Sequence, residues 1–89
     1  MRTLQGHSNG VFSAIFALNG KTLISGSSDS TIRLWDISAG ECTQVLQGHQ
    51  SGIFSIALSP QGNIIASASD DLTVKLEDIY AYFMLNILQ

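Results

Sequence analysis

Short apolar runs alternate with turn-forming residues along the whole chain, the pattern that predicts antiparallel strands. In the first half we predict strands at residues 11–17, 22–27, 31–37 and 42–47. The turns between them are predicted at Asn19-Gly20, Ser28-Asp29-Ser30 and Ala39-Gly40, with positive backbone angles at Asn19-Gly20. The first strand is apolar on both sides of its pleat, so both faces of the sheet must be covered.

The second half of the chain repeats the first at an offset of 42 residues, without a gap. Gly6-His7 falls on Gly48-His49, and Thr31 falls on Thr73. A fixed period of this length indicates a repeat architecture, in which each unit buries its apolar faces against its neighbours. We therefore expect an all-β chain of two four-stranded antiparallel units.

Composition narrows the functional class. Of the 89 residues 45% are hydrophobic and 12% charged, which is typical of a folded chain. The formal net charge is −3 and the four basic residues are scattered, so no nucleic-acid surface is expected. Residues 79–88 are too few to span a membrane. The single cysteine and the absence of an apolar leader make the cytoplasm the expected location.

The residues Gly6-His7, Ser25, Ser28-Asp29 and 31–36 (Thr-Ile-Arg-Leu-Trp-Asp) resemble the signature of the WD-repeat family, and the period of 42 fits it. The second copy departs from the signature at Glu77-Asp78, where the Trp-Asp pair belongs, and again beyond residue 79. The resemblance implies a β-propeller built of four-stranded blades.

The resemblance also implies a structural hydrogen-bond tetrad in each copy, running from Asp to His, from His to Ser and from Ser to the indole N–H. Such a chain would tie three strands and a loop together. Its expected members are His7, Ser25, Asp29 and Trp35 in the first copy, and His49, Ser67 and Asp71 in the second. In the second copy Glu77 offers no indole donor.

Ser25, His7 and Asp29 could also be mistaken for the triad of a hydrolase. Duplication of the set argues against one evolved active site, so we expect no enzyme and keep hydrolysis as the alternative. The two histidines lack a short-spaced partner ligand and no phosphate-binding loop is present, so no metal or cofactor is expected. Cys42 is expected to be a buried or edge thiol.

The resemblance implies a non-catalytic scaffold that binds proteins or peptides at the ends of its strands. The positions that it implies for the partner-binding face are mostly small, which favours weak binding. They are Ser8, Gly10, Ser28, Gln50, Gly52 and Asp70.

Two blades leave two faces bare, and closed propellers use about four to eight blades. We therefore expect copies of the chain to close a ring, as a tetramer of eight blades in preference to a trimer of six. The alternative is that the chain is a fragment of a longer WD-repeat protein.

Three segments follow from the repeat: an N-terminal partial outer strand at residues 1–5, blade 1 at 6–47, and blade 2 at 48–89 with a divergent tail from residue 80. The tail fits either an outer strand or an apolar stripe at helical spacing. The two ends of the chain compete for one outer position on a second blade, and we favour the tail as its outer strand. In the alternative, the N-terminal strand of one copy pairs with the last blade of its neighbour across the joint and displaces the tail. The expected oligomer contacts are Arg2, Thr3, Leu4, Phe83, Leu85 and Ile87.

Overall fold

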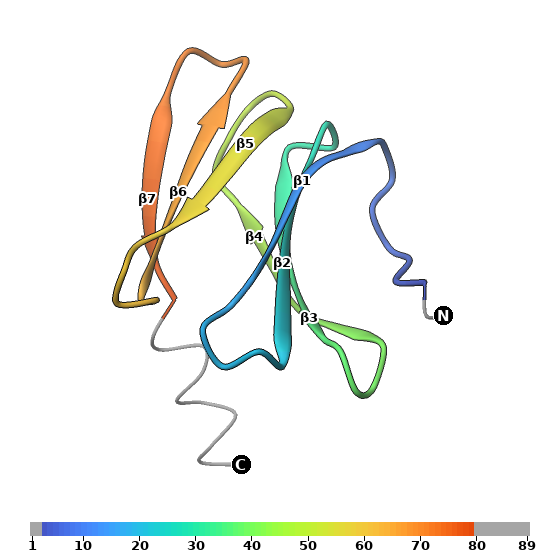
Figure 1. Ribbon diagram of the computed structural model, residues 1–89. Helices are drawn as coiled ribbons and strands as arrows, with labels where there is room; N and C mark the ends of the chain where they lie inside the picture. Colours follow the sequence, from blue (N-terminus) through green and yellow to red (C-terminus); the bar gives the residue numbers. More distant parts are fainter. Residues whose placement is uncertain (1–2, 80–89) are drawn as a thin grey trace.

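Seven strands in two antiparallel sheets make up residues 3–79, the part of the chain that the computed structural model describes (Figure 1). The first sheet has the order β1-β2-β3-β4 and the second β5-β6-β7, and no helix occurs in these residues. The strands are β1 (Val11–Phe16), β2 (Thr22–Ser27), β3 (Thr31–Asp36), β4 (Glu41–Gln47), β5 (Ile53–Leu58), β6 (Ile64–Ser69) and β7 (Val74–Asp78). The predictions of an all-β fold and of a four-stranded first unit are confirmed.

The strands of the first sheet end where the sequence places turn residues. Gly20 has a φ of 68°, which suits the hairpin between β1 and β2. The prediction of a positive φ at Asn19 was wrong, because Asn19 stabilises the turn through its side chain instead. Its Oδ1 accepts hydrogen bonds from the backbone N–H groups of Lys21 and Thr22, as Asn does in an Asx turn.

The two sheets repeat one another in register. Ser25 pairs with Ala14 and Arg33 in the first sheet, and Ser67 pairs with Ile56 and Lys75 in the second. The first strand of each sheet, β1 and β5, carries a register shift at the same point, two residues into the strand. Since directly opposite residues of a sheet share a face, equivalent side chains point the same way in both units.

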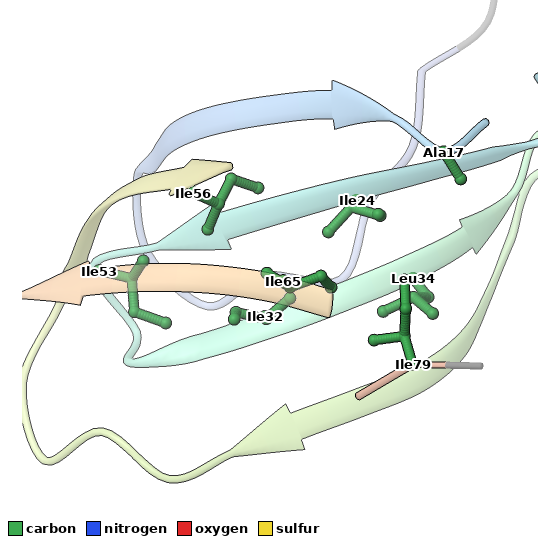
Figure 2. Packing of buried hydrophobic residues seen from close by; sticks show 8 residues of the cluster. All are labelled: Ala17, Ile24, Ile32, Leu34, Ile53, Ile56, Ile65 and Ile79. Carbon is green, nitrogen blue, oxygen red and sulfur yellow. The ribbon is translucent and has the colours of Figure 1, made fainter. Parts of the chain in front are cut away.

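The main core lies between the two sheets, where β5 packs against β1 and β2. Figure 2 shows side chains from both sheets pointing toward one another in this layer. The buried residues of the layer are Ala17, Ile24, Ile32, Leu34, Ile53, Ile56, Ile65 and Ile79. Fully burying a side chain such as Ile24 or Ile65 stabilises the fold by about 1.5 to 3 kcal/mol each, so this layer holds the two units together.

The expected fourth strand of the second unit falls in residues 80–89, outside the described residues, as does Arg2. Thr3 to Gln5 lie in no strand of the single chain. Pairing of these residues with the last blade of another copy is the alternative to an outer strand in the tail, so the N-terminal outer strand stays a prediction, and so does closure into a ring.

Candidate functional site

A chain of hydrogen bonds joins four side chains of the first unit. His7 Nδ1 lies 2.8 Å from Asp29 Oδ2 and His7 Nε2 lies 2.6 Å from Ser25 Oγ. The Trp35 indole N–H donates to Ser25 Oγ at 2.8 Å. Because a carboxylate only accepts, His7 carries its proton on Nδ1 and its Nε2 accepts from the Ser25 hydroxyl.

These hydrogen bonds link the segment before β1, strands β2 and β3, and the turn between those strands. The prediction that it ties three strands was wrong in that detail, because His7 and Asp29 both lie outside strands. Ser25 and Trp35 are 4% and 2% exposed. A buried network that satisfies its polar groups fixes one arrangement of the elements it joins.

Asp29 takes part in this hydrogen-bond network as a charged carboxylate. Burial by itself would raise the pKa of the Asp29 carboxyl, but several hydrogen bonds act against this. They come from the Thr31 side chain, from His7, and from the backbone N–H groups of Thr31 and Ser8. The net effect is a pKa well below the usual range of a carboxyl group.

The second unit repeats three of the four members. His49 Nδ1 lies 3.0 Å from Asp71 Oδ2 and His49 Nε2 lies 2.7 Å from Ser67 Oγ. The pKa of Asp71 is also lowered, first by the hydrogen bond from Thr73. Glu77 occupies the position equivalent to Trp35, so Ser67 receives no indole hydrogen bond.

Sequence reasoning missed two further residues of each network. The Thr31 hydroxyl donates to Asp29 Oδ1 at 2.5 Å, and that of Thr73 donates to Asp71 Oδ1. Ser27 Oγ accepts from the backbone N–H of Asp29 and donates to the Gly10 carbonyl, and Ser69 does the same in the second unit. All four positions repeat at the offset of 42, and that repetition was the available signal.

The six residues expected to face a partner lie on loops and turns that cluster at one end of the two sheets (Figure 1). The backbone N–H groups of Ser8 and Gln50 donate to Asp29 and Asp71, at 3.0 Å in each case. The backbone N–H groups of Ser28 and Asp70 donate to the carbonyls of Gly10 and Gly52. Ser28 and Gly52 meet across the two units, since an added Cβ at Gly52 would lie 2.9 Å from Ser28 Cα.

The family model of the WD domain, G-beta repeat (WD40), matches residues 1–36 and 40–76. The chain belongs to the WD40 repeat family. The second match stops one residue before Glu77, which is where the second repeat loses its tryptophan.

Three curated relatives match this WD40 chain over about the length of one repeat. WD repeat-containing protein pop1 of Schizosaccharomyces pombe is 44% identical over 45 residues, covering 51% of this chain and 6% of that protein. Cell division control protein 4 of Saccharomyces cerevisiae is 50% identical over 42 residues, covering 47% and 5%. Nuclear distribution protein nudF of Emericella nidulans is 48% identical over 46 residues, covering 51% and 10%. The chain therefore spans at most a tenth of the length of these three relatives.

Among the described residues, one hollow lies beside the first WD40 unit and another lies between the two units. The larger, of about 460 Å³, lies beside the hairpin turns of the first unit and contains none of the predicted site residues. It borders Asp36, whose Oδ1 accepts from Ser38 and Ala39 and so stabilises a turn. The smaller, of about 60 Å³, lies beside Ser67 and Glu77.

The remaining expectations concern metals, membranes and contacts between copies. Within residues 3–79 no group of three His, Cys, Asp or Glu side chains is arranged to hold a metal ion. The same residues contain no helix long and apolar enough to cross a membrane. Of the expected oligomer contacts, Thr3 is exposed and Leu4 is partly buried. Arg2, Phe83, Leu85 and Ile87 lie outside the described residues.

Proposed function

We propose that this chain is a non-catalytic protein-interaction scaffold that joins copies of itself head to tail into a closed β-propeller. One observation carries the proposal: each bare face of the chain is equivalent to one side of the joint between its own two sheets. We define the leading face of a sheet as the side that carries the tetrad serine, and the trailing face as the opposite side.

The joint inside the chain packs the trailing face of the first sheet on the leading face of the second. Ile32 and Leu34 supply the trailing side and are 5% and 1% exposed, and Ile53 on the leading side is 1% exposed. The residues that repeat them at the offset of 42 are bare: Val74 and Leu76 are each 70% exposed, and Val11 is 52% exposed. A contiguous apolar face of this kind marks an interaction surface.

Side-chain sizes on the two bare faces are complementary. In the joint inside the chain, a methyl group added at Gly26 would lie 2.9 Å from Ile53 Cγ2 and 3.1 Å from Ile56 Cγ2, so only glycine fits. In a joint between copies the equivalent of Gly26 is Ala68, which is larger. The residues equivalent to Ile53 and Ile56 are Val11 and Ala14, which are smaller, so the methyl group of Ala68 has room at a contact where only glycine fits within the chain.

A ring built from this two-blade unit contains an even number of blades. Known propellers have about four to eight blades, so a tetramer with eight blades or a trimer with six would bury every sheet face. We favour the tetramer. Because the two sides of each joint are different surfaces, the contact is heterologous, and a ring is the closed assembly that such contacts form.

The loop end that carries the six residues named above is the proposed partner-binding face of the ring. Ser8, Gln50 and Asp70 are exposed there, and their small or polar side chains favour weak binding to other proteins or peptides. The buried position of Ser25 supports a structural role over hydrolysis, because its Oγ is held by both Trp35 and His7. We therefore assign no enzymatic activity.

The second candidate is that these residues are a piece of a longer WD40 protein, which the short coverage of the relatives favours. In that case further repeats of the same protein would occupy the two bare faces. The isolated chain would still present both faces, and longer partners of the same family would compete with self-assembly.

Two charged substitutions test the head-to-tail contact. Leu76→Asp blocks the trailing face and Val11→Asp blocks the leading face, and neither residue is buried within the chain. Each variant alone should be a monomer by light scattering, whereas an equal mixture should form a dimer through its one intact pair of faces. Phe54→Asp is the control. Phe54 is 52% exposed beside the formed joint and its equivalent Phe12 is 63% exposed at the bare face, so a charge at this position stays in water whether or not a joint forms.

The control variant should keep the mass of the wild-type assembly. The proposal is contradicted if Leu76→Asp assembles like the wild type, or if the mixture of the two blocked variants stays monomeric while the wild type assembles.

A further inference from the structure

The smaller cavity lies in the joint between the two sheets, beside the position where the second repeat carries Glu77 instead of tryptophan. Its volume is about 60 Å³. Apolar walls come from both sheets, and polar groups come from both repeats, with Ser30 and Gln47 supplied by the first. Its lining includes the apolar side chains of Ile32, Leu46 and Ile53 and the polar side chains of His49, Ser67 and Lys75.

The first repeat shows what fills this position when tryptophan is present. Trp35 is 2% exposed there and donates its N–H to Ser25. The chain before His7 covers the ring, since an added Cβ at Gly6 would lie 3.0 Å from Trp35 Cη2. Gly48 repeats Gly6 and lines the cavity in the second repeat, so the glycine that lies over the indole is kept while the indole is replaced.

Ser67 gives the cavity a hydrogen-bond acceptor. It is 3% exposed, and its Oγ is 2.7 Å from His49 Nε2, to which it donates as Ser25 does to His7. A hydroxyl oxygen can also accept, and Ser25 uses that capacity for the indole N–H. The Ser67 hydroxyl oxygen can accept a hydrogen bond in the same way, and Ser67 borders the cavity.

We propose that this cavity binds a small, neutral, planar heteroaromatic compound with a ring N–H, of the indole class. The N–H donates to Ser67 Oγ, and the ring packs against Ile32, Leu46 and Ile53. A water molecule needs about 10 to 15 Å³ of such volume, so the cavity has room for several waters or for part of one ring. The five-membered ring that carries the N–H enters the cavity in this proposal, and the fused ring lies at its mouth.

The mouth of the cavity favours a neutral ligand. Lys75 and Glu77 both border it, both are exposed, and their charges are opposite. A ligand with a net charge would meet one like charge at this mouth, whereas the fused ring of an indole can lie against the Lys75 ammonium. Both walls belong to one chain, so the site goes beyond the proposed assembly and does not depend on it.

Titration of the ¹⁵N-labelled full chain with indole tests the site. Saturable shifts are expected at the amides of Ser67, His49 and Ile32, with a dissociation constant on the order of 1 mM for so few atoms. 1-Methylindole has nearly the same shape but no donor. It should bind roughly tenfold more weakly, because Ser67 then gains no hydrogen bond.

Two variants check that the shifts report this cavity. Glu77→Trp places an indole there covalently and should abolish binding, while Glu41→Trp, on the outer strand of the first sheet, should leave it unchanged. Should Glu77→Trp fail to fold, Ser67→Ala must still weaken indole binding roughly tenfold. The proposal is overturned by non-saturable shifts, by equal affinity for 1-methylindole, or by binding that survives Glu77→Trp or Ser67→Ala.

Discussion

Replacing Trp35 with phenylalanine tests the structural role of the tetrad. The indole donates to Ser25 at 2.8 Å and is 2% exposed, so the substitution removes a buried hydrogen bond and part of a buried ring. Losing a buried hydrogen-bond partner costs about 1 to 3 kcal/mol. The shorter ring adds about 1 kcal/mol, as small core truncations do. We expect Trp35→Phe to lower the free energy of unfolding by about 2 to 4 kcal/mol in total.

Chemical denaturation followed by far-UV circular dichroism measures this change, at one fixed chain concentration because assembly contributes to stability. In a thermal scan the loss corresponds to a fall in the melting temperature of roughly 8 °C or more for a chain of this size. Phe12→Ala is the control. Phe12 is 63% exposed, so its removal should change stability by no more than about 0.5 kcal/mol.

A double-mutant cycle assigns the loss to the hydrogen bond. Trp35→Phe and Ser25→Ala, measured singly and together, should show a coupling energy of about 1 kcal/mol or more, because the two side chains are in contact. A cost of Trp35→Phe below about 0.5 kcal/mol, together with no coupling, would refute the reasoning that the tetrad supports the fold.

Three further changes probe the second repeat, the carboxylates and the chain ends. Glu77→Trp should raise the free energy of unfolding by about 1 kcal/mol, because Ser67 gains a donor; a loss would show that the second repeat cannot hold the ring. The folded pKa of Asp29 lies below its unfolded value of 3.8, so its contribution is present above that pH and is lost as pH falls through the lower folded value. Acid unfolding should therefore depend less on pH in Asp29→Asn, and an unchanged dependence would contradict this. Deleting residues 80–89 should disrupt assembly while deleting residues 1–5 is mild, as size-exclusion chromatography can show; the reverse would assign the outer strand to the N-terminus of a neighbour.

The repeat predicts most of the first sheet because each strand is bounded by local turn chemistry. The strand Thr22–Ser27 was placed at its observed bounds, and the other three strands of this sheet differ by one residue at one end. The turn between β6 and β7 shows where local rules fail. Leu72 adopts a φ of 71°, a conformation that its side chain disfavours and that the fold imposes.

The tetrad was expected because the sequence resembles the WD-repeat signature, and three of its four members repeat in the second copy. Thr31 and Ser27 repeat just as regularly, yet Ser and Thr are common in strands and turns and their type alone indicates no partner. The cavity beside Ser67 could not be located in this way, because it depends on how one sheet packs on the other.

The exposure of the two bare faces was likewise beyond local rules. Leu34 and Leu76 are the same residue type at equivalent positions, and only their tertiary surroundings make one buried and the other exposed.

The mass of the chain in solution tests the central claim most directly. Light scattering coupled to size-exclusion chromatography should give an assembly of four chains of 9.5 kDa each, or of three in a six-bladed ring. The circular dichroism of that species should show strand structure. A well-behaved monomer of 9.5 kDa with the same strand content would contradict the account, because both bare faces would then be stable in water.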